Sequence, residues 1–202
     1  MTEAAACYAA EMAEMRRTGR LYKLPIMRGI VVSTLWNVGD RTAIGFIQRQ
    51  PPSTYVVDYY ENAGEEVEHY VAKLWELAKE RGHSYNGKHY LCCQADPKAY
   101  ERRLRELWIS LDSVILEHEV ALWTGIEALR TALARLWIDP ERCPGLVEAL
   151  DNYRPGDDKH AHAVEMLRQG AQIGLFGKEA QVVESDEQKR RRSRRYRNWR
   201  QW

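Results

Sequence analysis

The organisation of this chain is clearest in the stretch Leu35-Trp36-Asn37-Val38-Gly39-Asp40-Arg41-Thr42-Ala43-Ile44-Gly45-Phe46-Ile47. The apolar, β-branched residues 29–34 lead into it and predict a buried strand, and residues 42–48 predict a second one. Between them, Asn37 to Arg41 supplies turn residues. Residues 54–60 predict a third strand, so we expect an antiparallel meander. An acidic residue at the first turn could hold a metal ion, and a plain hairpin turn is the alternative.

The rest of the chain alternates helices with strands. Apolar residues at helical spacing predict an amphipathic helix over 67–78. The later elements are expected as a strand at 89–93, a helix from Pro97, a strand at 113–116, a helix from Ile126 to Trp137, a short helix at 146–150 and a helix at 160–172. With the short helix left out, the order β-β-β-α-β-α-β-α-α predicts an α/β domain with a mixed five-stranded sheet flanked by helices, the layout of a ribonuclease H-like domain.

We expect three segments: a lead-in helix in residues 1–20, one domain over 21–175, and a tail over 176–202. No apolar run is long enough to span a bilayer, and the Met1 end has no apolar signal core, so a soluble intracellular protein is expected, without a membrane partner. The four cysteines lack CxxC spacing, which favours reduced thiols. A zinc site formed by these cysteines with His160 and His162 is the less favoured alternative.

Charge is distributed unevenly. The net charge is +1, but residues 189–202 contain eight basic residues and no acid, which leaves −7 for the remainder. Basic residues interleaved with aromatic ones favour phosphate neutralisation and base stacking on nucleic acid. A solvated tail, or one that binds an acidic protein surface, is the alternative. The predicted DNA-binding residues are Arg190, Arg191, Arg192, Arg194, Arg195, Arg197, Trp199 and Arg200.

One nucleotide-binding pattern is present but is rejected. Residues 82–88 satisfy GxxxxGK, yet His89 follows where a magnesium-binding Ser or Thr is needed. The segment also follows a helix and enters a strand, which is the reverse of a phosphate-binding loop. The sequence therefore contains no ATPase motor.

Several segments, in order, resemble the C-terminal nuclease domain of tailed-phage large terminase subunits. The first is Trp36 to Ile44, which is similar to the family's Trp-Asp-Leu-Gly…Asp-x-Thr-Ala-Ile pattern. The others are Asp58-Tyr59-Tyr60-Glu61, His89-Tyr90-Leu91 before the family's Pro-His-Asp-Ala motif, Asp139 to Cys143, Ala149 to Arg154, and His162 to Arg168, which resembles a closing His-x-Ala-Asp-Ala-x-Arg helix. The resemblance covers about residues 8–172.

The resemblance implies a two-metal nuclease whose acidic positions are altered here. Such enzymes hold Mg²⁺ or Mn²⁺ with carboxylates, and the metals activate water and stabilise the leaving oxygen. The three family positions carry Asn37, Gln94 and Glu165, so only the last remains acidic. Possible substitute ligands are Asp40, Asp58 and Asp96. Acids at strand ends and in loops are otherwise ordinary solvated charges.

Two functions follow from the resemblance. The first is a packaging nuclease that cuts double-stranded DNA with Mg²⁺ or Mn²⁺, impaired by the loss of two carboxylates, in the cytoplasm of a bacterial host. The second is a terminase-derived protein that binds DNA, or a packaging partner such as the portal, without cutting. A decayed domain without activity is the weakest option.

Overall fold

The computed structural model describes residues 6–82, 85, 87–107, 112–116 and 121–177. Along them the chain forms α1 (Ala9–Arg17), β1 (Ser33–Val38), β2 (Arg41–Gln50), β3 (Ser53–Ala63), α2 (Val67–Arg81), β4 (His89–Cys93), α3 (Pro97–Leu107), β5 (Ser113–Ile115), α4 (Leu122–Leu133), β6 (Leu136–Ile138), α5 (Pro144–Asn152) and α6 (Asp158–Gln172). No helix in this part of the chain is long and apolar enough to cross a lipid bilayer.

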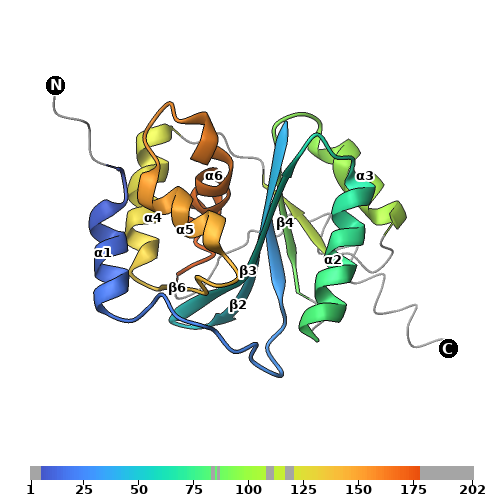
Figure 1. Ribbon diagram of the computed structural model, residues 1–202. Coiled ribbons are helices and arrows are strands. Elements are labelled where there is room, and N and C mark those ends of the chain that lie inside the picture. The colour runs from blue at the N-terminus through green and yellow to red at the C-terminus, as the bar shows by residue number, and fades with distance from the viewer. Residues whose placement is uncertain (1–5, 83–84, 86, 108–111, 117–120, 178–202) are drawn as a thin grey trace.

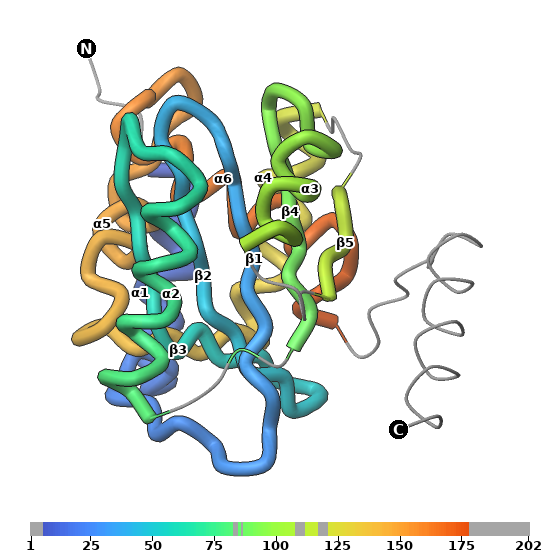
Figure 2. Tube along the Cα trace, turned by 90° about the vertical axis from the view of Figure 1, so that its right-hand side faces the viewer, coloured from blue at the N-terminus to red at the C-terminus, as the bar shows by residue number. Residues whose placement is uncertain are grey.

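The strands form one mixed sheet in the order β5-β4-β1-β2-β3-β6. The meander β1-β2-β3 is antiparallel, whereas β4, β5 and β6 pair in parallel with their neighbours. Helices α2 and α3 cover one face, and α1, α4, α5 and α6 gather on the other (Figure 1). Figure 2 shows β1 between β2 and β4. Each face therefore has its own apolar core, one on either side of the meander.

The predicted mixed α/β sheet is confirmed, but its described part has six strands and not five. Sequence reasoning placed Trp137 at the end of a helix, and this was wrong. Helix α4 ends at Leu133, and a turn with the Arg135 N–H donating to the Ala132 carbonyl leads into β6. There Trp137 stacks on Tyr55 of β3, with ring centroids 6.0 Å apart. A three-residue strand is too short to show a period of two.

Helix α1 is part of the hydrophobic core on the α6 side of the sheet. Its Met12 and Met15 are fully buried, as is Tyr8 just before it, whose ring stacks on Tyr153. The helix contacts α4 and α5. Burying three large apolar side chains stabilises the fold by several kcal/mol, at about 1.5–3 kcal/mol each.

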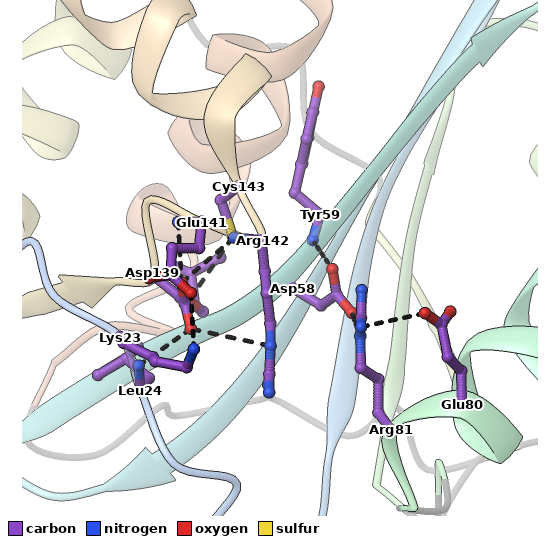
Figure 3. Close-up of polar contacts among 11 residues, drawn as sticks. Lys23, Leu24, Asp58, Tyr59, Glu80, Arg81, Asp139, Glu141, Arg142 and Cys143 are labelled. Atoms are coloured by element: carbon purple, nitrogen blue, oxygen red, sulfur yellow. Dashed lines mark hydrogen bonds and ion pairs between the residues drawn. The ribbon is translucent and has the colours of Figure 1, made fainter.

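A buried carboxylate ties the segment before β1 to the loop after β6. Asp139 has no exposed surface, and its two oxygens accept hydrogen bonds from the backbone N–H groups of Leu24, Glu141 and Arg142 at 2.9–3.2 Å (Figure 3). Next to it, the Ile138 N–H donates to the Arg20 carbonyl, and Leu21 forms a parallel bridge with Ile138. The early segment therefore covers the β6 edge of the sheet at this point.

Candidate functional site

The three acidic positions implied by the resemblance lie at one end of the sheet. β1 and β4 run in parallel, with Asn37 beside Cys92, and the Gln94 N–H donates to the Val38 carbonyl. Helix α6, which carries Glu165, packs across β1 and β2. Because β1 and β4 end together, residues that are far apart in sequence meet below the N-terminal half of α6.

Asn37 is buried and held by the helix backbone. Its side chain is 1% exposed, and its Nδ2 donates to the His162 carbonyl of α6 at 3.3 Å. Among the described residues neither its Oδ1 nor the buried Nδ1 of His162 has a hydrogen-bond partner. A neutral amide thus occupies this position, and its one free acceptor carries no formal charge.

Glu165 faces this same place from α6. Its carboxylate forms an ion pair with Arg168 at 2.8 Å and accepts a hydrogen bond from the Gln169 amide at 3.3 Å. Burial, and then the negative charge of Glu165, raise the pKa of the Cys92 thiol to about 11. This thiol is therefore protonated at neutral pH and is a poor nucleophile.

Gln94 lies over the β1–β2 turn. A Cβ added at Gly39 would come within 2.7 Å of the Gln94 Oε1, so the glycine is what lets the two segments approach. The Gln94 residue itself is exposed. Gln94 is therefore on the solvent-exposed side of the site, whereas Asn37 is buried.

The substitute acids lie elsewhere or have other roles. Asp40 is exposed in the β1–β2 turn. Asp96 caps α3, accepting from the Lys98 and Ala99 N–H groups at 3.0 Å. Asp58 is 2% exposed and accepts from Arg81 Nε of α2 at 3.1 Å (Figure 3). Since Asp58 is in register with Phe46, whose side chain packs beside α2, it points to the face opposite α6.

These residues do not fit a two-metal centre. Within the described parts of the chain, no group of three or more His, Cys, Asp or Glu side chains lies close enough to hold a metal ion. The same result applies to the alternative zinc site: His160 contacts Asp157 and Glu148 near the start of α6. The individual ligand assignments made from the sequence stay predictions, and those for the arginine-rich tail fall outside the described residues.

Two residues near the site were missed by sequence reasoning. Glu61 of β3 is in register with Ala43, itself in register with Asn37, so all three side chains share the α6 face. The Tyr59 hydroxyl donates to Glu61 at 2.6 Å, and burial raises the Tyr59 pKa well above its usual value. Strand alternation was the available signal for Glu61. The second missed residue, Arg168, lies one helical turn after Glu165.

Terminase proteins are among the solved structures that share this arrangement of strands and helices. The nuclease domain of the large terminase from thermophilic phage G20c, solved with cobalt, matches with a TM-score of 0.59 at 12% identity. The match covers 84% of this chain and 98% of that domain. The chain has the fold of a large terminase nuclease domain.

Two further structures agree with the terminase nuclease fold. The nuclease domain from Thermus phage P74-26 gives a TM-score of 0.55 at 15% identity, covering 87% of this chain and 98% of that one. The large terminase of another thermophilic bacteriophage gives 0.63 at 13% identity over 82% of this chain. This chain spans only 45% of the length of that whole terminase. No protein-family model and no curated protein sequence matches.

Proposed function

We propose that this chain is a terminase nuclease-type domain that binds double-stranded DNA in viral genome packaging without cutting it. The observation that carries the proposal is the state of Asn37. At the first position where the family has a carboxylate, a neutral amide is buried and held to the backbone of α6. Two-metal catalysis requires several anionic ligands around the ions.

The runner-up is an impaired metal-dependent nuclease. Glu165 supports it, because this carboxylate is present at the third family position and lies close to Cys92 of β4. Solved G20c nuclease domains contain cobalt or magnesium. In this alternative Mg²⁺ or Mn²⁺ would be held by Glu165 with Asp40 or Asp96, and it would activate water for phosphodiester hydrolysis; the third candidate, Asp58, points to the opposite face of the sheet.

DNA binding is proposed to rest on the basic tail. Eight positive charges in residues 189–202, beside Tyr196, Trp199 and Trp202, suit a polyanion with stacking bases. The cytoplasm of an infected bacterium is the proposed location. An acidic surface of the portal, or of another packaging protein, is the competing partner for the tail.

A cleavage assay on supercoiled plasmid with Mn²⁺ or Mg²⁺ tests the proposal directly. We expect no nicking by the full chain, and no difference between it and the variants Glu165→Ala and Asp40→Ala. Glu141→Ala, an exposed acid on the loop after β6, is the matched control. Metal-dependent nicking that Glu165→Ala abolishes but Glu141→Ala does not would replace the proposal with the nuclease alternative.

DNA affinity measured against salt concentration tests the tail. The logarithm of the DNA-binding constant falls as the logarithm of the salt concentration rises. If all eight basic residues contact phosphates, deleting residues 186–202 makes this slope less steep by up to about 7. An unchanged slope would remove the tail from the proposed interface and leave a protein partner as its ligand.

A further inference from the structure

Arg168 lies in the interior between α6 and α4. Only 6% of its side chain is exposed. Gly125 of α4 makes room for it, since a Cβ there would approach the Arg168 Nε to 2.7 Å. Arg168 also lies close to the Tyr153 side chain. A guanidinium remains charged at all physiological pH values, so a buried one must have an anion close by.

That anion is Glu165. The two side chains are one helical turn apart, with Arg168 Nη1 2.8 Å from Glu165 Oε2. Removing one member of a buried ion pair leaves the other as an uncompensated charge, which costs far more than the pair contributes. If a metal ion took Glu165 as a ligand, Arg168 would be left as an uncompensated buried charge.

The Glu165–Arg168 pair decides the net charge of the three family positions. The resemblance places an arginine at this point of the family's closing helix as well, but there three carboxylates outnumber it. In this chain Asn37 and Gln94 are neutral, so Glu165 and Arg168 cancel each other. The three positions together therefore carry no net negative charge to attract a divalent cation, and the nearby Glu61 carboxylate is itself paired with Arg41 at 3.6 Å.

We infer that Arg168 is the resident counter-ion of Glu165, so that this end of the sheet is a charge-neutral site that needs no metal. The inference deepens the proposed function and rests on it for the assignment of the three positions. It gives Glu165 a structural role in place of a ligand role. The structural role and the ligand role predict opposite changes in melting temperature when Glu165 is neutralised.

The two roles are distinguished by the melting temperature measured in the absence of metal. In a cluster of carboxylates awaiting metal, neutralising one relieves like-charge repulsion and raises the melting temperature. In a buried ion pair, neutralising the acid lowers it. We expect Glu165→Gln to lower the Tm in EDTA by about 3–6 °C, because a third of Glu165 remains exposed and solvent screens the pair in part.

The matched control is Glu127→Gln on α4. Glu127 forms the same one-turn pair with Arg130, but its side chain is 66% exposed. Its Tm should change by less than about 1 °C, since exposed pairs contribute little. A Tm for Glu165→Gln that rises, or equals that of Glu127→Gln, would overturn the inference.

Metal binding gives a second readout, and its first step uses the wild-type protein alone. Titrating Mn²⁺ into the full-length protein and counting free ions by electron paramagnetic resonance should show no bound equivalent at millimolar Mn²⁺. The same titration on Arg168→Met, with Arg168→Lys as the charge-keeping control, should show tighter binding only for Met. Stoichiometric Mn²⁺ binding by the wild type that Glu165→Gln removes would overturn the inference.

The two proposals fail separately. Bound Mn²⁺ without any DNA cleavage contradicts the counter-ion role but leaves the non-cutting function intact. Cleavage that does not depend on Glu165, with the expected loss of Tm, contradicts the function and leaves the counter-ion role intact.

Discussion

Asn37 and Glu165 lie at the same end of the sheet but differ in their access to water. Asn37 is enclosed and bonded to helix backbone, whereas Glu165 is partly exposed and paired with a cation. Burial therefore sets what each polar side chain can do. The same is true of His89, the buried first residue of β4, whose Nδ1 lies 2.7 Å from the Thr34 hydroxyl oxygen.

His89 makes stability depend on pH. Burial lowers its pKa from 6.5 to about 4, so in acid the unfolded chain takes up a proton that the folded chain refuses. Its contribution is complete above pH 6.5 and is lost as the pH falls towards 4, by roughly 3 kcal/mol in all. Urea unfolding of wild type and His89→Gln across pH 4–7 measures this. The variant should lose stability less steeply, and parallel curves would contradict the prediction.

The sequence alone grouped part of the candidate site, whose ligand roles stay predictions. Motif order placed residues 37, 94 and 165 together, which the parallel β1–β4 pair and α6 explain. It did not reveal that Asp58 faces α2, because the register shift between Phe46 and Ile47 in the β2–β3 pair is a tertiary feature. Nor could it show that Arg168 is buried, since an i,i+3 Glu–Arg pair on a helix is usually an exposed one.

At the scale of elements, the contact between α4 and α6 holds the site's helix in place. Long amphipathic helices such as α2 were predictable from their apolar spacing, and so was α6. The end of α4 was not, since Leu129, Leu133 and Trp137 continue a helical period through the turn into β6. Tertiary pairing of Trp137 with β3 overrides that local pattern.

Gly125 of α4 lies directly against side chains of α6. A Cβ there would lie 2.5 Å from the Gln172 amide nitrogen and 2.7 Å from Arg168 Nε. Alanine normally stabilises a helix relative to glycine by up to about 1 kcal/mol, but here we expect Gly125→Ala to destabilise by about 1–3 kcal/mol. Denaturant unfolding measures it. The exposed neighbour Thr124→Ala should change stability by less than about 0.5 kcal/mol, and equal effects would contradict the prediction.

At the scale of the whole molecule, the sheet separates two cores of different make-up. The α2–α3 side is built mainly from residues 24–107, whereas the α6 side joins the first helix to the last three. The first helix and the last three helices therefore pack into a single core. A lead-in helix that stands apart from the domain would not contribute three fully buried side chains.

Deleting residues 1–19 should therefore abolish cooperative unfolding. The lost burial of Tyr8, Met12 and Met15 amounts to roughly 5–9 kcal/mol, a large share of the total stability of a domain of this size. Differential scanning calorimetry gives the readout. The full-length double variant Met12→Leu/Met15→Leu keeps the side-chain volume and should still melt in one transition. A deletion variant that melts like the wild type would show that α1 is dispensable.

The bridge between Leu21 and Ile138 has a consequence for self-association. A sheet edge presents unpaired backbone groups to which another chain can add. Here the β6 edge is met by the protein's own early segment, whereas β5, at the other end of the sheet, pairs only with β4 in the described structure. Two copies joined edge to edge through β5 would form a closed pair. With the second edge covered, strand addition could not continue into a fibre.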